Sequence, residues 1–259
     1  MNRDDLLKEL RKRADPAIVA GKARYGITPQ YAGSGLAGSG LAGSGETLGI
    51  RIPDLLSMAK KIGTDHDLAV DIWSFRIHEA RILACMIADP EKVSERLMEQ
   101  WVGDFDSWDL CDQCCNRLFR KTDLAWEKMV EWTQRDEEYV KRAGFVLMAV
   151  RAVHDKTAPD GSFEALFPVI CREASDDRNF VKKSVNWALR QIGKRNLALN
   201  KKAVATCEKI VKIDSKTARW IAGDARRELT GETVLKRLTA ATPLMNWVGC
   251  HLIKKKSGI

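Results

Sequence analysis

Apolar positions recur at helical spacing along almost the whole chain after residue 50. They stand three and four residues apart, as on one face of an amphipathic helix, and runs of alternating residues that would indicate strands are absent. Prolines and glycines mark the helix ends, because proline is favoured in the first turn and glycine just after the last. After a first helix from Pro53 to Gly63, we predict helices at about 66–74, 76–88, 92–103, 107–120, 123–134, 137–153, 162–174, 178–192, 197–212 and 215–229.

Short helices joined by tight turns are typical of an α-solenoid, in which each helix pair buries its apolar stripe only against its neighbours. We therefore expect an all-α fold, a right-handed α-solenoid of HEAT-like antiparallel helix pairs. A single repeat domain is expected over residues 1–259, with a C-terminal tail at about 240–259.

Residues 32–46, AGSGLAGSGLAGSGE, repeat a glycine-rich pentapeptide. This composition predicts a flexible insertion or linker. A phosphate-binding loop is excluded, because no strand precedes the segment and no Gly-Lys-Ser/Thr follows it.

Composition narrows the class of protein. The chain of 259 residues is 45% hydrophobic, enough for a full core, and its charged start is unlike a signal peptide. No apolar run is long enough to span a bilayer, so we expect a cytoplasmic protein without a membrane partner, nucleoid-associated if prokaryotic. The net charge of +8 favours a polyanionic partner such as nucleic acid.

The segment 177–196 places a tryptophan among cations. On a helical wheel one stripe is apolar and consists of Val181, Val185, Ala188 and Ile192. Nearly opposite lie Lys183, Trp187, Arg190 and Lys194. Either Trp187 packs under a neighbouring repeat beside a solvated basic face, or this face contacts nucleic acid. A second helix, 215–229, has Lys216, Arg219, Gly223 and Arg226 along one side, and the two helices together would form a basic track.

Arg142 falls in a helix, 139–153, that is apolar on all sides. Because a buried guanidinium without a partner is strongly destabilising, we expect a carboxylate or a phosphate to reach it. A purely structural ion pair and a functional one are both compatible with the sequence.

The stretch DSWDLCDQCC, residues 106–115, holds three of the seven cysteines. The odd total without regular spacing indicates reduced thiols, and Cys111, Cys114 and Cys115 fall on the apolar arc of the helix. The four histidines show no zinc-type spacing with them, so we expect no metal. Trp108 and Asp112 lie one turn apart on the edge of that arc.

Five segments together resemble the AlkD-like DNA alkylation repair enzymes. In chain order they are LGIRIPDLLSMAKKI (48–62), IHEARILACMI (77–87), DSWDLCD (106–112), VKRAGFVLMA (140–149) and NFVKKSVNWALRQIGKRN (179–196). The resemblance runs from about residue 48 to about 230. Residues before 48 and after 230 depart from the family pattern, so no contacts to DNA are carried over there.

The resemblance implies a HEAT-like repeat DNA glycosylase with a concave basic surface for duplex DNA. By motif, Asp112 matches the catalytic carboxylate, Arg142 the arginine beside it, and Trp108 and Trp187 the aromatic residues that bracket the sugar of the damaged nucleotide. The basic helices add the candidate DNA-binding residues Phe180, Lys182, Lys183, Arg190, Lys194, Arg195, Lys216, Arg219 and Arg226.

The expected activity is hydrolysis of the N-glycosidic bond of N3- or N7-alkylated purines in duplex DNA by a monomer that needs no cofactor. An alkylated purine already carries positive charge and leaves without a general acid, so a carboxylate and ring faces near the developing sugar cation suffice. Two alternatives stay open: a noncatalytic helical-repeat protein that binds DNA or another polyanion, and a protein-interaction scaffold.

Overall fold

The computed structural model describes residues 2–22, 24, 27 and 45–240. Most of the predicted glycine-rich insertion at 32–46 and of the predicted tail at about 240–259 lies outside the described residues. Every regular element in the described part is helical, apart from one isolated bridge between Glu46 and Ile77. The predicted all-α fold is therefore confirmed. No helix in this part is long and apolar enough to cross a membrane.

The helices of the N-terminal half end with the segment that contains Trp108. They are α1 (Arg3–Lys12), α2 (Pro16–Lys22), α3 (Ile52–Ile62), α4 (His66–Trp73), α5 (His78–Ile87), α6 (Glu95–Gly103) and α7 (Trp108–Arg117). The C-terminal half contains α8 (Ala125–Glu131), α9 (Glu138–His154), α10 (Asp160–Glu164), α11 (Phe167–Arg172), α12 (Asn179–Gly193), α13 (Leu197–Ile210), α14 (Lys216–Leu229) and α15 (Glu232–Ala240).

The predicted helix at 162–174 is wrong, because the structure divides this segment into α10 and α11. Pro168 stands in the first turn of α11. Proline has no amide hydrogen to continue the helical ladder, so a new helix begins there. Helices α1, α2 and α15 lie outside the predicted set.

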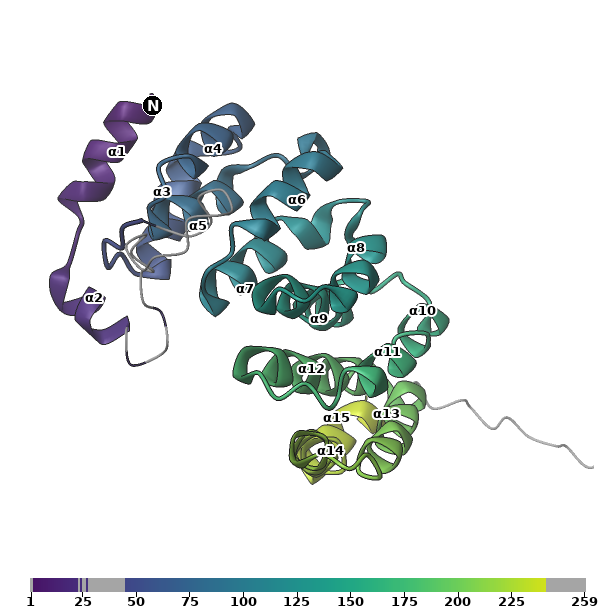
Figure 1. The fold of residues 1–259 in the computed structure, drawn as a ribbon. Coiled ribbons are helices and arrows are strands. Elements are labelled where there is room, and N and C mark those ends of the chain that lie inside the picture. Colours follow the sequence, from purple (N-terminus) through teal and green to yellow (C-terminus); the bar gives the residue numbers. More distant parts are fainter. Residues whose placement is uncertain (1, 23, 25–26, 28–44, 241–259) are drawn as a thin grey trace, which may run out of the picture.

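The helices follow one another along an arc from α1 to α14 (Figure 1). Helix α9 packs against both α7 and α12, and α12 packs in turn against α14. Four helices that are far apart in the sequence are thus consecutive neighbours in space. A residue on α7 can therefore meet residues on α9 and α12.

Helix α9 is buried on nearly all sides, as its apolar sequence predicts. Gly144 permits the close approach of the preceding repeat, because a Cβ there would lie 2.9 Å from the carbonyl oxygen of Met129 and from Cγ2 of Thr133. Because Arg142 belongs to α9, this packing also fixes the position of Arg142.

A fully buried carboxylate fixes the start of the repeat array. Glu79 on α5 accepts hydrogen bonds from the backbone amides of Leu48 and Gly49, both at 2.8 Å, and pairs with Lys22 Nζ at 2.5 Å. Burial raises the pKa of Glu79, but Lys22 and the other donors outweigh it, so that its pKa lies below the usual range. Glu79 thereby ties α2 to α5.

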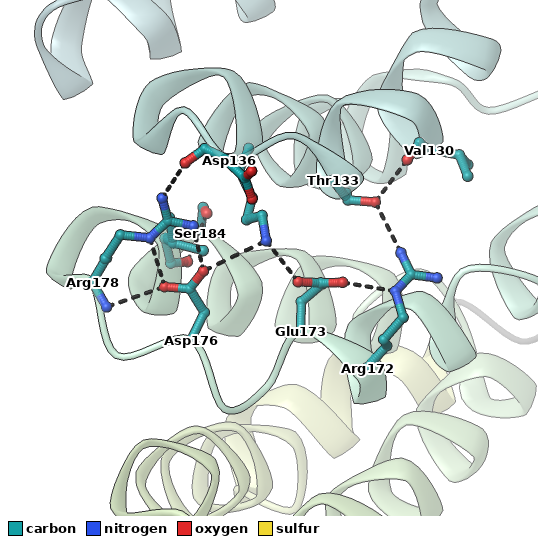
Figure 2. A network of polar contacts seen from close by, with 10 residues as sticks. Val130, Thr133, Asp136, Arg172, Glu173, Asp176, Arg178 and Ser184 are labelled. Carbon is teal, nitrogen blue, oxygen red and sulfur yellow. Dashed lines mark hydrogen bonds and ion pairs between the residues drawn. The ribbon is translucent and has the colours of Figure 1, made fainter.

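A polar network joins the loop between α11 and α12 to the α9 repeat (Figure 2). Arg178 binds Asp176 at 2.6 Å and donates to the carbonyl oxygen of Asp136 at 2.5 Å. Lys141 on α9 lies 2.9 Å from Glu173 and 3.7 Å from Asp176. These contacts hold the N-terminal end of α12 against α9.

Candidate functional site

A bidentate ion pair between α7 and α9 lies at the centre of the site. Arg142 donates from Nε to Asp112 Oδ1 at 3.0 Å and from Nη2 to Asp112 Oδ2 at 2.8 Å. Its Nη1 donates to the carbonyl oxygen of Phe180, at the N-terminal end of α12, at 2.7 Å. Arg142 is only 5% exposed, so the expected carboxylate partner of the buried guanidinium is Asp112.

The Asp112 carboxylate is not sealed by this pair, since 18% of its side chain remains exposed. Burial raises the pKa of Asp112 above its ordinary value, and the neighbouring Arg142 opposes the rise without cancelling it. Asp112 therefore takes up a proton at a higher pH than a solvated aspartate.

Two adjoining hollows share Asp112, Arg142 and Lys183 in their walls. The first, of about 520 Å³, is also lined by Arg24, Trp108, Asn179 and Phe180. The second, of about 460 Å³, is also lined by Asn186, Trp187, Arg190, Trp220 and Asp224. We call the two hollows together the Asp112 cleft. The four residues proposed for catalysis, Trp108, Asp112, Arg142 and Trp187, all border it.

Some of the cations predicted on α12 line the Asp112 cleft, and others lie outside it. Lys183 and Arg190 line the Asp112 cleft, and Lys182 lies over the ring of Trp220, with Nζ 5.9 Å from the ring centroid. Arg190 also pairs with Glu228. Lys194, which pairs with Glu228 at 2.5 Å, lies outside the cleft.

Arg195 is also outside the cleft, although it was predicted to bind DNA. Its guanidinium donates to the carbonyl oxygens of Ala152 at 2.9 Å and Asp155 at 2.6 Å, and stacks 4.1 Å from the ring centroid of Phe163. This arginine joins the ends of neighbouring repeats, and its hydrogen bonds to the backbone leave it turned away from Asp112.

The predicted basic track on α14 does not border the Asp112 cleft. Arg226 pairs with Glu208 of α13 at 3.3 Å, and Arg219 pairs with Asp214 at 3.3 Å. Lys216 is exposed but lines neither hollow. The reason is the rotation of α14, which turns Trp220 and Asp224 toward the cleft, Arg226 toward α13 and Arg219 toward Asp214 in the segment between α13 and α14.

Five further residues line the cleft that were not predicted from the sequence: Arg24, Asn179, Asn186, Trp220 and Asp224. Trp220 is 44% exposed and lies off the buried stripe of α14 formed by Ala218, Ile221 and Ala225, so a helical wheel could have found it. Arg24 follows α2, in a region where the residue pattern gave no signal.

The conspicuous cysteines of the 106–115 stretch belong to the core. Cys111, Cys114 and Cys115 have no exposed surface, and burial raises the pKa of the Cys114 and Cys115 thiols far above the usual range. No group of three His, Cys, Asp or Glu side chains in the described part of the chain could hold a metal ion. These thiols pack as small hydrophobic side chains.

The chain is similar to known proteins in two of three comparisons. The family model "DNA alkylation repair enzyme" matches residues 6–229. A solved structure of "a new family of proteins related to the HEAT-like repeat DNA glycosylases with affinity for branched DNA structures" superimposes with a TM-score of 0.66 at 17% identity, covering 88% of this chain and 95% of that one. This likeness supports the HEAT-like repeat fold. No curated protein matches significantly. With the family model covering nearly the whole chain, the protein belongs to the DNA alkylation repair enzyme family.

Proposed function

We propose that the protein is a DNA glycosylase that hydrolyses the N-glycosidic bond of cationic N3- or N7-alkylated purines in duplex DNA. The observation that carries the proposal is the position of Asp112, oriented by Arg142, in one cleft with Trp108 and Trp187.

The chemistry of this substrate class suits these side chains. An alkylated purine leaves as a neutral base, so no general acid is required, and positive charge develops on the sugar. The Asp112 carboxylate stabilises that charge and orients the attacking water, while the electron-rich faces of the two tryptophans stabilise it further. Arg142 holds both carboxylate oxygens in place and acts as a positioning residue.

The same cleft offers contacts to the DNA backbone. Lys183 borders both hollows and Arg190 borders the second, where each can approach a phosphate. Arg24 adds a cation beside Trp108. The substrate strand would thus be held at the N-terminal ends of α9 and α12, where Asp112 meets Arg142.

The proposal is tested with the Asp112→Asn variant, which keeps the shape of the side chain and removes its charge. Purified protein is incubated with methylated duplex DNA, and released 3-methyladenine and 7-methylguanine are quantified under single-turnover conditions. Loss of the charge is expected to slow release at least about 100-fold. Asp54→Asn is the matched control, because Asp54 pairs with Arg51 at 3.0 Å at a partly exposed position on α3, outside the cleft. Release that is absent from the wild type, or equal in both variants, rejects the assignment.

A second candidate is a noncatalytic DNA-binding protein. The solved structure of similar fold belongs to proteins "with affinity for branched DNA structures". Salt-dependent binding to duplex or four-way junction DNA without base release would favour this function over hydrolysis.

A further inference from the structure

A third hollow, of about 650 Å³, opens at the C-terminal ends of α9 and α12 and is closed by α15. Four cations line it together with one carboxylate. The cations are Lys156, Lys194, Arg195 and Arg237, and the carboxylate is Asp160. Nothing in the proposed reaction uses this hollow, which lies outside the Asp112 cleft.

The walls of the hollow are held by hydrogen bonds. Asn196 Nδ2 donates to both oxygens of Asp160 at 2.9 Å, so the carboxylate already has a partner. Arg237 Nη2 donates to the carbonyl oxygen of Lys194 at 3.2 Å, which joins α15 to the end of α12. With Arg195 bound to the carbonyl oxygens of the α9 end, the hollow is a built feature of the fold.

More cations lie at the end of α7 and in the turn after it. Arg117, Arg120 and Lys121 cluster there, and Arg151 of α9 donates to the carbonyl oxygen of Arg120 at 2.8 Å, which joins the two helix ends. Burial, and after it the nearby Arg120, Lys156 and Arg117, lower the pKa of His154 at the end of α9, so these cations lie near Lys156 of the hollow. Within the described residues, no carboxylate pairs with Arg117, Arg120, Lys121 or Lys156. We call these four residues with Lys194 and Arg237 the C-terminal rim.

The partial negative charge at a helix C-terminus is too small to balance the cations of the C-terminal rim. A helix C-terminus carries only about half a negative charge, whereas the last turn of α7 and the turn after it together hold three cations, Arg117, Arg120 and Lys121. Burial, and after it the neighbouring cations Arg120 and Arg117, lower the pKa of Lys121 below its ordinary value. The rim is thus a site of mutually repelling charge that an anion would relieve.

The third hollow lies on the same faces of α9 and α12 as the Asp112 cleft. On α9, Arg142 lines the cleft and Val153 lines the third hollow, eleven residues later. On α12, Lys183 and Lys194 are related in the same way. Eleven residues are about three helical turns and rise about 16 Å. Along both helices, the third hollow therefore lies about 16 Å from the Asp112 cleft.

This separation fits the two strands of a duplex. Phosphates of one strand follow one another about every 3.4 Å along the axis. The two strands are separated by a groove about 12 Å wide between their edges, so the centres of the two backbones lie farther apart than this width. We propose that the C-terminal rim binds backbone phosphates of the strand opposite the one held in the Asp112 cleft, which gives the protein its preference for duplex over single-stranded DNA. The identity of the strand in the cleft rests on the proposed function.

The double variant Lys121→Gln/Lys156→Gln tests the rim, because both side chains are exposed and their loss leaves the core intact. Dissociation constants are measured for undamaged duplex and for the matching single strand over a range of salt concentrations. The slope of log Kd against log salt for the duplex should fall by about 1 for each phosphate contact removed. The ratio of duplex to single-strand affinity should fall with it.

The control is Lys201→Gln/Lys212→Gln, which removes the same charge at exposed positions on α13 and just after it. It should bind both DNAs as the wild type does. A duplex slope in the rim variant equal to that of the control, or an equal loss of duplex and single-strand affinity, overturns the proposal. Since undamaged DNA is used, the result is independent of base release, and a protein without glycosylase activity can still pass this test.

Discussion

Both carboxylate oxygens of Asp112 accept hydrogen bonds from Arg142, while part of the side chain stays open to the cleft. A fully enclosed ion pair would be structural, because neither group could approach a substrate. A solvated carboxylate would lack orientation and a low-dielectric surrounding. At the scale of single residues, the Asp112 carboxylate is both oriented by Arg142 and partly exposed to the cleft. Electrostatic stabilisation of a sugar cation requires both properties.

The raised pKa of Asp112 predicts the pH dependence of base release. The rate should fall on the acid side as Asp112 becomes protonated, with a midpoint above the ordinary value of 3.8. Because Arg142 opposes the rise, Arg142→Gln should move the midpoint to still higher pH. Single-turnover rates against pH, each normalised to its own maximum, provide the measurement. A midpoint that is unchanged or lower in the variant contradicts this account of the pair.

If Trp187 stabilises the sugar cation, it does so through the face of its ring. Trp187→Ala should slow base release about tenfold, since an aromatic face near a cation contributes about 0.5 to 2 kcal/mol. Trp187→Phe keeps a ring and should retain most of the rate. Single-turnover release measures both. Equal losses in the two variants would mean that Trp187 acts by packing and not through its ring.

At the scale of elements, the buried Glu79 decides how the N-terminal helices meet the repeats. Three donors from α2 and the segment before α3 converge on this carboxylate. Lys22 is only 15% exposed at the other end of the pair. Helix α2 thus takes its place through a charge interaction, and none of its own residues is buried.

Glu79→Gln should lower the free energy of unfolding by about 2 kcal/mol, because hydrogen bonds to a charged group are lost. The pKa of Glu79 is depressed when folded, so its contribution is present above the ordinary value of 4.5 and is lost as pH falls through the folded pKa. The variant should lack this pH dependence. Urea unfolding and amide exchange at Leu48 and Gly49 are the measurements. Glu232→Gln removes an exposed pair with Lys236 and should cost no more than about 0.5 kcal/mol.

At the scale of the whole molecule, the site depends on the fit between consecutive repeats. Asp112, Arg142 and the Phe180 carbonyl belong to three helices, α7, α9 and α12. The network in Figure 2 holds α12 against α9 without touching the cleft. The geometry of the proposed site is therefore sensitive to contacts made elsewhere in the array.

Asp176→Asn tests this dependence. It weakens the hold of Arg178 and Lys141 on the loop before α12. Amide exchange should quicken at the N-terminal end of α12, and base release should slow because the Phe180 carbonyl no longer fixes Arg142. Asp224 lines the cleft, so Asp224→Asn would alter the cleft itself, and Asp54→Asn on α3 again serves as the control. Normal base release together with faster amide exchange would show that the network does not control the geometry of the site.

The all-α class, most helix positions after residue 50 and the apolar faces of those helices follow from the sequence, because they depend on local periodicity. The burial of Cys111, Cys114 and Cys115 follows in the same way, and so does the need of Arg142 for a partner. The resemblance of five segments supplied the four residues now seen around one cleft.

Only the tertiary structure decided which groups meet. Asp112 and Arg142 are thirty residues apart and no local rule pairs them, so that before the structure only the family resemblance had placed one beside the other. The rotation of α14 turns Trp220 inward and Arg226 toward α13, which depends on packing between helices. The sequence predicts Arg195 as a surface cation that binds DNA, whereas in the structure its guanidinium donates to backbone carbonyl oxygens of a neighbouring repeat. The sequence fixes the faces of each helix, whereas contacts between repeats decide which faces form a site.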